Sequence, residues 1–95
     1  MTELNDIRIK IDMIDKELVA LFERRLTLAK RAGDIKRRLN LPIQDKAREA
    51  EILLNRASML TDATLAEPLG VFLITLLSLS RGEQHKANNM EAPYA

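Results

Sequence analysis

The chain has 95 residues, 46% of them apolar and 31% charged, which indicates one globular domain and excludes a disordered or collagen-like chain. Fifteen basic and 14 acidic residues give a net charge of +1, which argues against bulk binding of nucleic acid. The absence of cysteine and the single histidine exclude a disulfide framework and a thiolate- or histidine-based metal site within one chain. Aromatic residues make up only 3%, which disfavours a β-sandwich or barrel.

Two segments of the sequence bear on targeting and on insertion into a membrane. Residues 1–10 are charged and lack the apolar stretch of a signal peptide. The most apolar run, residues 69–79, is far shorter than the roughly 20 residues that a membrane span needs. We therefore expect a soluble, cytoplasmic protein that does not associate with a membrane.

Residues 4–40 carry a heptad-like apolar pattern that predicts one long helix. The apolar positions alternate between spacings of four and three residues, and they are Ile7, Ile11, Ile14, Leu18, Leu21, Leu28, Ala32, Ile35 and Leu39. The one position of this seam that is not apolar is Arg25. Such a helix would be about 55 Å long, too long for two shorter helices of the same chain to cover. An antiparallel or intertwined homodimer would cover the rest of the seam.

Residues 40–44 are expected to form the turn that ends this helix. Asn40 tolerates the left-handed conformation of a helix end, and Pro42 cannot continue a helix. Asp45 is the expected N-cap of a second helix over residues 46–60.

A third helix is predicted from Thr64 to about residue 87. Thr64 with Glu67 three residues on has the form of a capping box. Gly70, early in this helix, is a candidate for a close approach to another helix. Residues 88–95 are expected to be a frayed tail. The sequence thus predicts a single all-α domain over residues 1–95, with a long, a short and a medium helix.

Four polar residues interrupt apolar faces of these helices. Arg25 and Lys36 share one face of the first helix, about 16 Å apart along its axis, so a small dianion between them could touch both. Ser80 and Gln84 lie one turn apart on the third helix and could form the hydrogen-bonding wall of a pocket. The alternatives are that Arg25 pairs with a glutamate across an interface and that the Ser80 stripe merely reaches solvent.

Four further polar residues have a position that bears on a site. Asp45, Arg48 and Glu49 lie in the first turn of the second helix, where they either cap and pair locally or face a ligand. Arg8 is about 25 Å from Arg25 and about 100° around the helix, so it could serve only a partner chain's site. His85, one residue off the Ser80 and Gln84 stripe, is expected to be exposed.

The combined spacing of these residues resembles the all-helical class of chorismate mutase. The resemblance covers roughly residues 4–87, and its strings are Ile7-Arg8, Ile11, Ile14-Asp15, Glu23-Arg24-Arg25, Ile35-Lys36, Pro42-Ile43-Gln44-Asp45, Arg48-Glu49, Ser80 and Gln84. It implies an intertwined homodimer with two equivalent sites, in which Arg8 crosses over to the partner's site. It also implies the rearrangement of chorismate to prephenate, in phenylalanine and tyrosine biosynthesis, with neither a metal nor a cofactor.

The resemblance assigns the catalytic roles to residues that hold the two ends of the substrate. Arg8 and Arg25 would bind the two carboxylates of chorismate. Lys36 and Gln84 would donate hydrogen bonds to the ether oxygen, where charge builds as the C–O bond breaks. Lys36, Gln84 and Arg25 are therefore the predicted catalytic residues.

The remaining binding residues implied by the resemblance lie on the second and third helices. Glu49 would accept a hydrogen bond from the ring hydroxyl of chorismate. Arg48 and Ser80 would line the carboxylate side, and Asp45 completes the binding set.

The sequence leaves four alternatives open. An isochorismate pyruvate lyase and a 4-amino-4-deoxychorismate mutase share the scaffold. A mutase activated by another enzyme of the pathway is a third possibility. A non-catalytic helical dimerisation module is the fourth, and it would require that Arg25 pairs with an acid of the partner chain and that no cavity exists.

Overall fold

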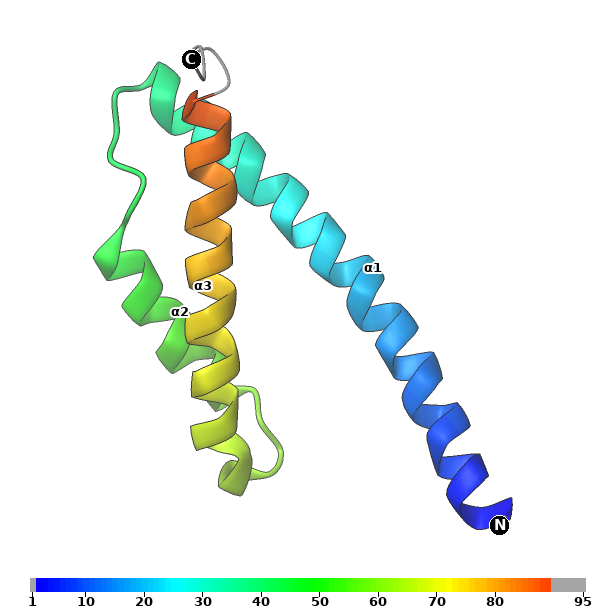
Figure 1. The fold of residues 1–95 in the computed structure, drawn as a ribbon. Helices are drawn as coiled ribbons and strands as arrows, with labels where there is room; N and C mark the ends of the chain where they lie inside the picture. The colour runs from blue at the N-terminus through cyan, green and yellow to red at the C-terminus, as the bar shows by residue number, and fades with distance from the viewer. Residues whose placement is uncertain (1, 90–95) are drawn as a thin grey trace.

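The computed structural model describes residues 2–89, which form a series of helices. They are α1 (Thr2–Arg38), α2 (Lys46–Ser58), the short 3-10 helix η1 (Ala63–Leu65) and α3 (Ala66–Asn89). No strand occurs within residues 2–89. The predicted all-α class with a long, a short and a medium helix is confirmed (Figure 1).

Helix α1 is much longer than the other two and determines the shape of the molecule. Only its C-terminal part lies against α3, and its N-terminal part extends away from both shorter helices (Figure 1). The radius of gyration is 17.1 Å and the extents are 55 × 30 × 18 Å. A compact domain of this length would have a radius of gyration of about 12 Å. The single chain therefore leaves much of α1 uncovered.

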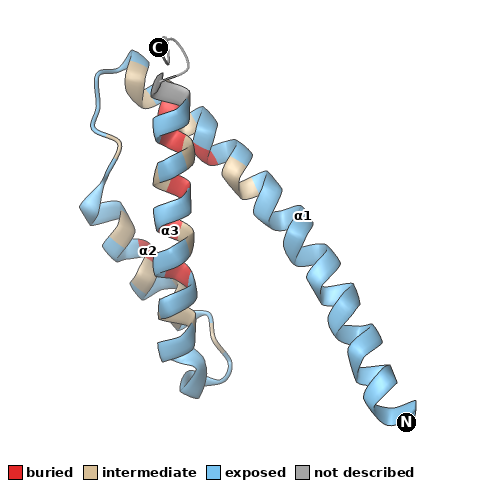
Figure 2. Ribbon diagram, in the orientation of Figure 1, coloured by how far each residue is buried: buried red, intermediate tan, exposed pale blue. Residues whose placement is uncertain are grey.

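The apolar seam of α1 is largely exposed in this chain. Ile7 is 50% exposed, Ile14 57% and Leu21 53%, and Figure 2 shows the N-terminal part of α1 as exposed throughout. The buried apolar side chains within residues 2–86 are few, and they are Ala29, Ile52, Leu73 and Leu77. The core of one chain thus lies only where the three helices meet.

The contact between α1 and α3 uses a different face of α1 from the predicted seam. Ala29 and Gly33 are buried there, whereas Leu28 and Ile35 of the seam are exposed. A Cβ atom added to Gly33 would lie 2.6 Å from both Cα and the carbonyl oxygen of Gln84. The missing side chain of Gly33 therefore lets the two backbones approach closely.

Gly70 has no such role within the described residues. A Cβ atom added there would meet nothing within 4 Å. Within one chain, the close helix approach occurs at Gly33 and not at Gly70.

The turn between α1 and α2 forms as the sequence predicts. Asn40 has φ of 59°, in the left-handed region, and Leu41 N–H donates to the carbonyl of Lys36 over 2.8 Å. Asp45 is the N-cap of α2, and its carboxylate accepts from the backbone N–H of Arg48 over 3.0 Å. These two residues fix where α2 starts relative to α1.

The start of α3 differs from the prediction. A 3-10 turn precedes α3, and its N-cap is Asp62, whose carboxylate accepts from the backbone N–H and the hydroxyl of Thr64. These two hydrogen bonds lower the pKa of Asp62. The predicted capping role of Thr64 is therefore wrong, because Thr64 lies inside the turn that Asp62 caps.

The ends of the shorter helices lie two residues from their predicted positions. Helix α2 ends at Ser58, before the predicted residue 60. Helix α3 continues through Asn89, so the first two residues of the predicted frayed tail are helical. The rest of that tail, residues 90–95, lies outside the described residues.

The segment Ala63–Lys86 is long and apolar enough, by length and composition alone, to cross a membrane. The mean hydropathy of its most apolar window is 1.6, and 17% of that window is buried. The apolar run of residues 69–79, on which the prediction from sequence rests, lies within this longer segment. The same segment carries two buried polar side chains, Ser80 and Gln84, so α3 has a packing role within this fold.

Candidate active site

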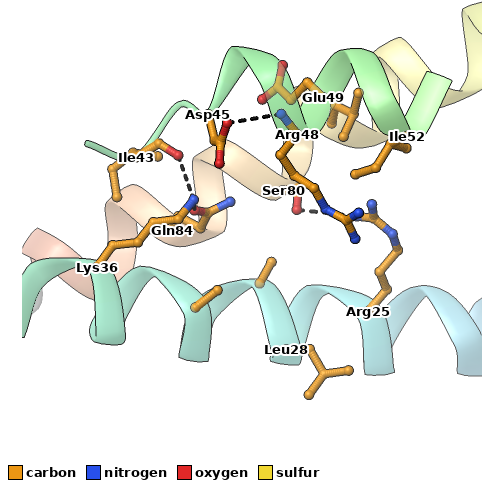
Figure 3. Close-up of a pocket in the computed structure, with 13 residues that line it drawn as sticks. Arg25, Leu28, Lys36, Ile43, Asp45, Arg48, Glu49, Ile52, Ser80 and Gln84 are labelled. Carbon is orange, nitrogen blue, oxygen red and sulfur yellow. Dashed lines mark hydrogen bonds between the residues drawn. The ribbon is translucent and has the colours of Figure 1, made fainter. Parts of the chain in front are cut away.

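A cavity of about 270 Å³ lies where α1, α2 and α3 meet. This volume is near the lower end of small-molecule sites, at roughly 300 Å³. Its apolar lining consists of Leu28, Ala29, Ala32, Ile43, Ile52 and Leu77. Its polar lining consists of Arg25, Lys36, Asp45, Arg48, Glu49, Ser80 and Gln84 (Figure 3).

The structure brings seven of the eight predicted binding residues to this one cavity. They come from all three helices and from positions up to 59 apart in the sequence, Arg25 and Gln84. The eighth, Arg8, is not among the lining residues. Arg8 belongs to the N-terminal part of α1, and that part of the helix extends away from the other helices (Figure 1).

At one end of the cavity, Lys36 and Gln84 lie next to each other. Lys36 Nζ donates to Gln84 Oε1 over 2.6 Å and to the carbonyl oxygen of Ile43 over 2.7 Å. An ammonium group has three hydrogens, so one donor of Lys36 is left for a ligand. Because Gln84 accepts through its oxygen, its amide nitrogen is left as a second donor. This end of the cavity can therefore offer two hydrogen bonds to one oxygen atom.

Further along α1, Arg25 brings a positive charge to the cavity. Its Nη1 donates to Ser80 Oγ over 3.3 Å, and no carboxylate within residues 2–89 pairs with it. Burial lowers the pKa of the Arg25 guanidinium, and the charges of Arg56 and Arg48 lower it further. Arginine stays protonated in proteins, so the direction of this shift means that the partly buried positive charge is unfavourable where it lies. A bound anion would relieve that cost.

The polar stripe of α3 is buried rather than exposed. Ser80 and Gln84 are each 8% exposed, so the alternative that the stripe merely reaches solvent is wrong. His85, the neighbouring residue, is exposed as predicted. The two buried side chains satisfy part of their hydrogen-bonding capacity with Arg25 and Lys36.

The acidic residues of the cavity are each engaged by groups of the protein. Asp45 caps α2 through its own carboxylate. Arg48 pairs with Glu51 over 2.6 Å at the exposed surface of α2. Glu49 accepts from Arg81 Nη1 at 2.6 Å to one carboxylate oxygen and 2.7 Å to the other. The carboxylates in and beside the cavity are therefore bound by groups other than Arg25 and Lys36, and these two cations stay available for an anion.

Two cations near the site were not predicted from the sequence. Arg81 is 32 residues from Glu49, and no local pattern links them. Arg56 interacts electrostatically with Arg25. The position of Arg56 could have been predicted, because Arg48, Ile52 and Arg56 recur every four residues and so share one face of α2.

The residues present suit the binding of an organic anion better than metal chemistry. Within the described residues there is no group of three or more His, Cys, Asp or Glu side chains that could hold a metal ion. The cavity instead combines a guanidinium, an ammonium and an amide at defined positions. The fold and the site thus define a small all-helical domain that can hold an anionic ligand between three helices.

A family model for chorismate mutase type II matches residues 7–85, which cover most of the chain and the whole cavity. The chain belongs to this family. No solved structure matches the chain.

Several curated proteins are similar to the chain. It is 33% identical over 75 residues to a chorismate mutase of Methanocaldococcus jannaschii, a match that covers 79% of this chain and 76% of that protein. It is 50% identical over 52 residues to a bifunctional chorismate mutase/prephenate dehydratase of Aquifex aeolicus, covering 55% of this chain. It is 39% identical over 71 residues to a T-protein of Enterobacter agglomerans, covering 75% of this chain. The chain spans only 14% and 17% of the lengths of the last two proteins.

Proposed function

We propose that the chain catalyses the rearrangement of chorismate to prephenate, a step of phenylalanine and tyrosine biosynthesis. The observation that carries the proposal is the Lys36–Gln84 pair, which leaves two donors at one end of a cavity that also contains Arg25. Chorismate is a dicarboxylate with an ether oxygen, and this donor set matches those groups. Membership of the chorismate mutase type II family supports the same activity.

The proposed reaction needs no chemical participation by the protein. One C–O bond breaks and one C–C bond forms within a single molecule, and no proton is transferred. The site has to hold the two ends of the substrate close together. It also has to stabilise the negative charge that develops on the ether oxygen, where preorganised donors have their largest effect. Lys36 and Gln84 would supply those donors, and Arg25 would bind one carboxylate.

The other lining residues would orient the substrate. Arg48 and Ser80 would lie on the carboxylate side, and Asp45 would complete that wall while it caps α2. Glu49 would accept a hydrogen bond from the ring hydroxyl. A bare dimerisation module is less well supported, because the chain has a cavity that Arg25 lines.

We further propose that the protein is a homodimer in which Arg8 of each chain completes the partner's site. The support is the long exposed seam of α1, with Ile7 at 50% and Ile11 at 49% exposure on the same helix as Arg8. Exposed apolar area costs about 25 cal/mol per Å², so a second copy of α1 packed on the seam would be favoured. The heptad spacing is that of a helix–helix contact. We also propose a soluble, cytoplasmic protein, because α3, the one helix among residues 2–89 that is apolar enough to cross a membrane, lines the cavity through Ser80 and Gln84.

Mixing two inactive variants is expected to restore activity if Arg8 crosses between chains. Arg8→Ala and Lys36→Ala each remove one residue of every site in their own homodimer. In a mixed dimer, one of the two sites keeps both residues. Random exchange of subunits should therefore recover about a quarter of the wild-type sites. We would measure this by denaturing and refolding an equimolar mixture, with each variant refolded alone as the control. Recovery no greater than that of the separate variants would show that Arg8 and Lys36 do not combine across chains.

The activity is expected to change by less than about twofold between about pH 6 and pH 8. Gln84 is an uncharged donor that has no proton to lose in this range. In Gln84→Glu, the activity should fall as the pH rises, because only the protonated carboxyl can donate and the Lys36 charge favours the ionised form. Steady-state rates of both proteins across this range test the expectation. A sharp decline of the wild-type rate would contradict the role of Gln84.

The direct test of the proposed function is turnover of chorismate by the purified chain. Loss of chorismate would be followed by absorbance, and the product, which has the same mass as chorismate, identified by its acid-catalysed conversion to phenylpyruvate. Isochorismate and 4-amino-4-deoxychorismate would be tested in parallel. Turnover of either in place of chorismate would reassign the substrate. Failure on all three by a folded dimer would overturn activity of the chain on its own, and would leave the dimerisation module or a mutase activated by another enzyme.

A further inference from the structure

One ion pair of the site links α2 to α3 behind the cavity wall. Arg81 Nη1 lies 2.6 Å from Glu49 Oε1 and 2.7 Å from Oε2, so a single nitrogen holds both carboxylate oxygens. The side chains are 29% and 20% exposed, less than those of the other ion pairs on α1 and α2. Glu49 lines the cavity, whereas Arg81 does not.

The pair restrains a carboxylate that would otherwise be free to move. A glutamate side chain has several rotatable bonds, and fixing it by a partner removes alternative rotamers before a ligand binds. A carboxylate has about four lone-pair positions. Contact with one nitrogen therefore leaves Glu49 able to accept a further hydrogen bond from the cavity side.

The pair also balances the charge of the site. An unpaired carboxylate beside the cavity would repel an anionic ligand, which Arg25 and Lys36 attract. Arg48, next to Glu49 in the sequence, is paired with Glu51 instead. Arg81 is thus the cation that the described residues place against Glu49.

We propose that Arg81 is a positioning residue that holds Glu49 as the acceptor for a donor group on the ring of the ligand, and so makes the site selective for ligands that carry a hydroxyl there. The inference rests on the proposed function, and it adds to it a residue outside the cavity that sets substrate preference. Arg81 itself would not touch the ligand.

The test compares two cyclic dicarboxylates that differ only in a ring hydroxyl. Their dissociation constants would be measured by calorimetry with the full chain, independently of turnover of chorismate. Because both probes carry the same two carboxylates, any change in the charge of the site affects both alike. The ratio of the two constants therefore reports the hydrogen bond to the hydroxyl.

Arg81→Met is expected to lower this preference about tenfold, the lower end of what a hydrogen bond to a charged group contributes. Arg81→Lys should recover most of it, because one nitrogen already makes both contacts in the wild type. Arg38→Met is the matched control, since it removes the exposed pair with Asp34 at 3.4 Å outside the cavity. It should change the preference by less than about twofold.

A double-substitution cycle separates positioning from general stability. In a Glu49→Gln background, adding Arg81→Met should leave the preference unchanged, because the carboxylate that Arg81 positions is gone. Thermal unfolding of each variant would be measured alongside. If Arg81→Met does not fold, Arg81→Gln takes its place in both backgrounds, because it also removes the positive charge that holds Glu49.

The inference would be overturned by a wild type that binds both probes equally, by a Glu49→Gln variant that keeps the full preference, or by an Arg81→Met effect that persists in Glu49→Gln. These results can occur in a protein that still converts chorismate. Conversely, the protein could fail to convert chorismate and still show a preference for the hydroxyl that depends on Arg81. That result would reject the proposed reaction and retain the role of Arg81.

Discussion

Lys36→Ala is expected to lower kcat for chorismate about 10²–10³-fold, the usual effect of removing one donor from a preorganised oxyanion site. Lys36 is the cation nearest to Gln84, and two of its three hydrogens are held by Gln84 and by the carbonyl of Ile43. Its position is therefore fixed before the substrate arrives. The charge on the ether oxygen is larger in the transition state than in the ground state, so kcat should fall more than KM rises.

Lys30→Ala provides the control for Lys36→Ala. Lys30 is an exposed lysine of the same helix and does not line the cavity. The expected result is a rate within about twofold of the wild type. Circular dichroism would establish that both variants keep their helices. A Lys36→Ala enzyme with kcat close to the wild-type value would remove the central role assigned to this residue.

Gly33→Ala is expected to destabilise the chain by about 2 kcal/mol and to reduce activity by about 10²-fold. The added methyl group would lie 2.6 Å from the Cα and carbonyl oxygen of Gln84. Backbone atoms cannot rotate away as a side chain can, so α1 and α3 must separate. The separation would move Lys36 away from Gln84, and a displacement of about 1 Å is enough for such a loss of rate.

Gly82→Ala is the matched control, because a Cβ atom there would meet nothing within 4 Å in the described chain. Alanine is the better helix former by up to about 1 kcal/mol, so this variant should unfold at the same or a higher temperature. Thermal denaturation and chorismate turnover would be measured for both. If Gly33→Ala behaved like Gly82→Ala, the close approach would not be needed for stability or for the site.

The elements with strong local signals were predicted correctly, except for the capping box at Thr64. The heptad spacing gave α1, and the caps Asn40 and Asp45 gave the turn and the start of α2. These features depend on a few neighbouring residues and on backbone geometry that each residue type favours. The convergence of lining residues from three helices on one cavity was anticipated only through the family resemblance.

Features that depend on contacts between distant segments were not predicted. The face of α1 that meets α3 is marked by Ala29 and Gly33, which carry little apolar area and so do not stand out in a hydrophobic pattern. The Arg81–Glu49 pair joins residues 32 apart. Thr64 was a reasonable cap by sequence alone, but Asp62 takes that place because η1 inserts a turn before α3.

The exposed seam of α1 has a consequence for how the protein behaves on dilution. A chain with so small a core of its own would obtain much of its stability from the second copy, and in such homodimers folding and association are one equilibrium. On the proposed dimer, the melting temperature and the specific activity should both fall as the protein is diluted. At low abundance, the number of working sites would then rise with the square of the number of chains. The total activity in a cell would therefore increase more steeply than the amount of the protein.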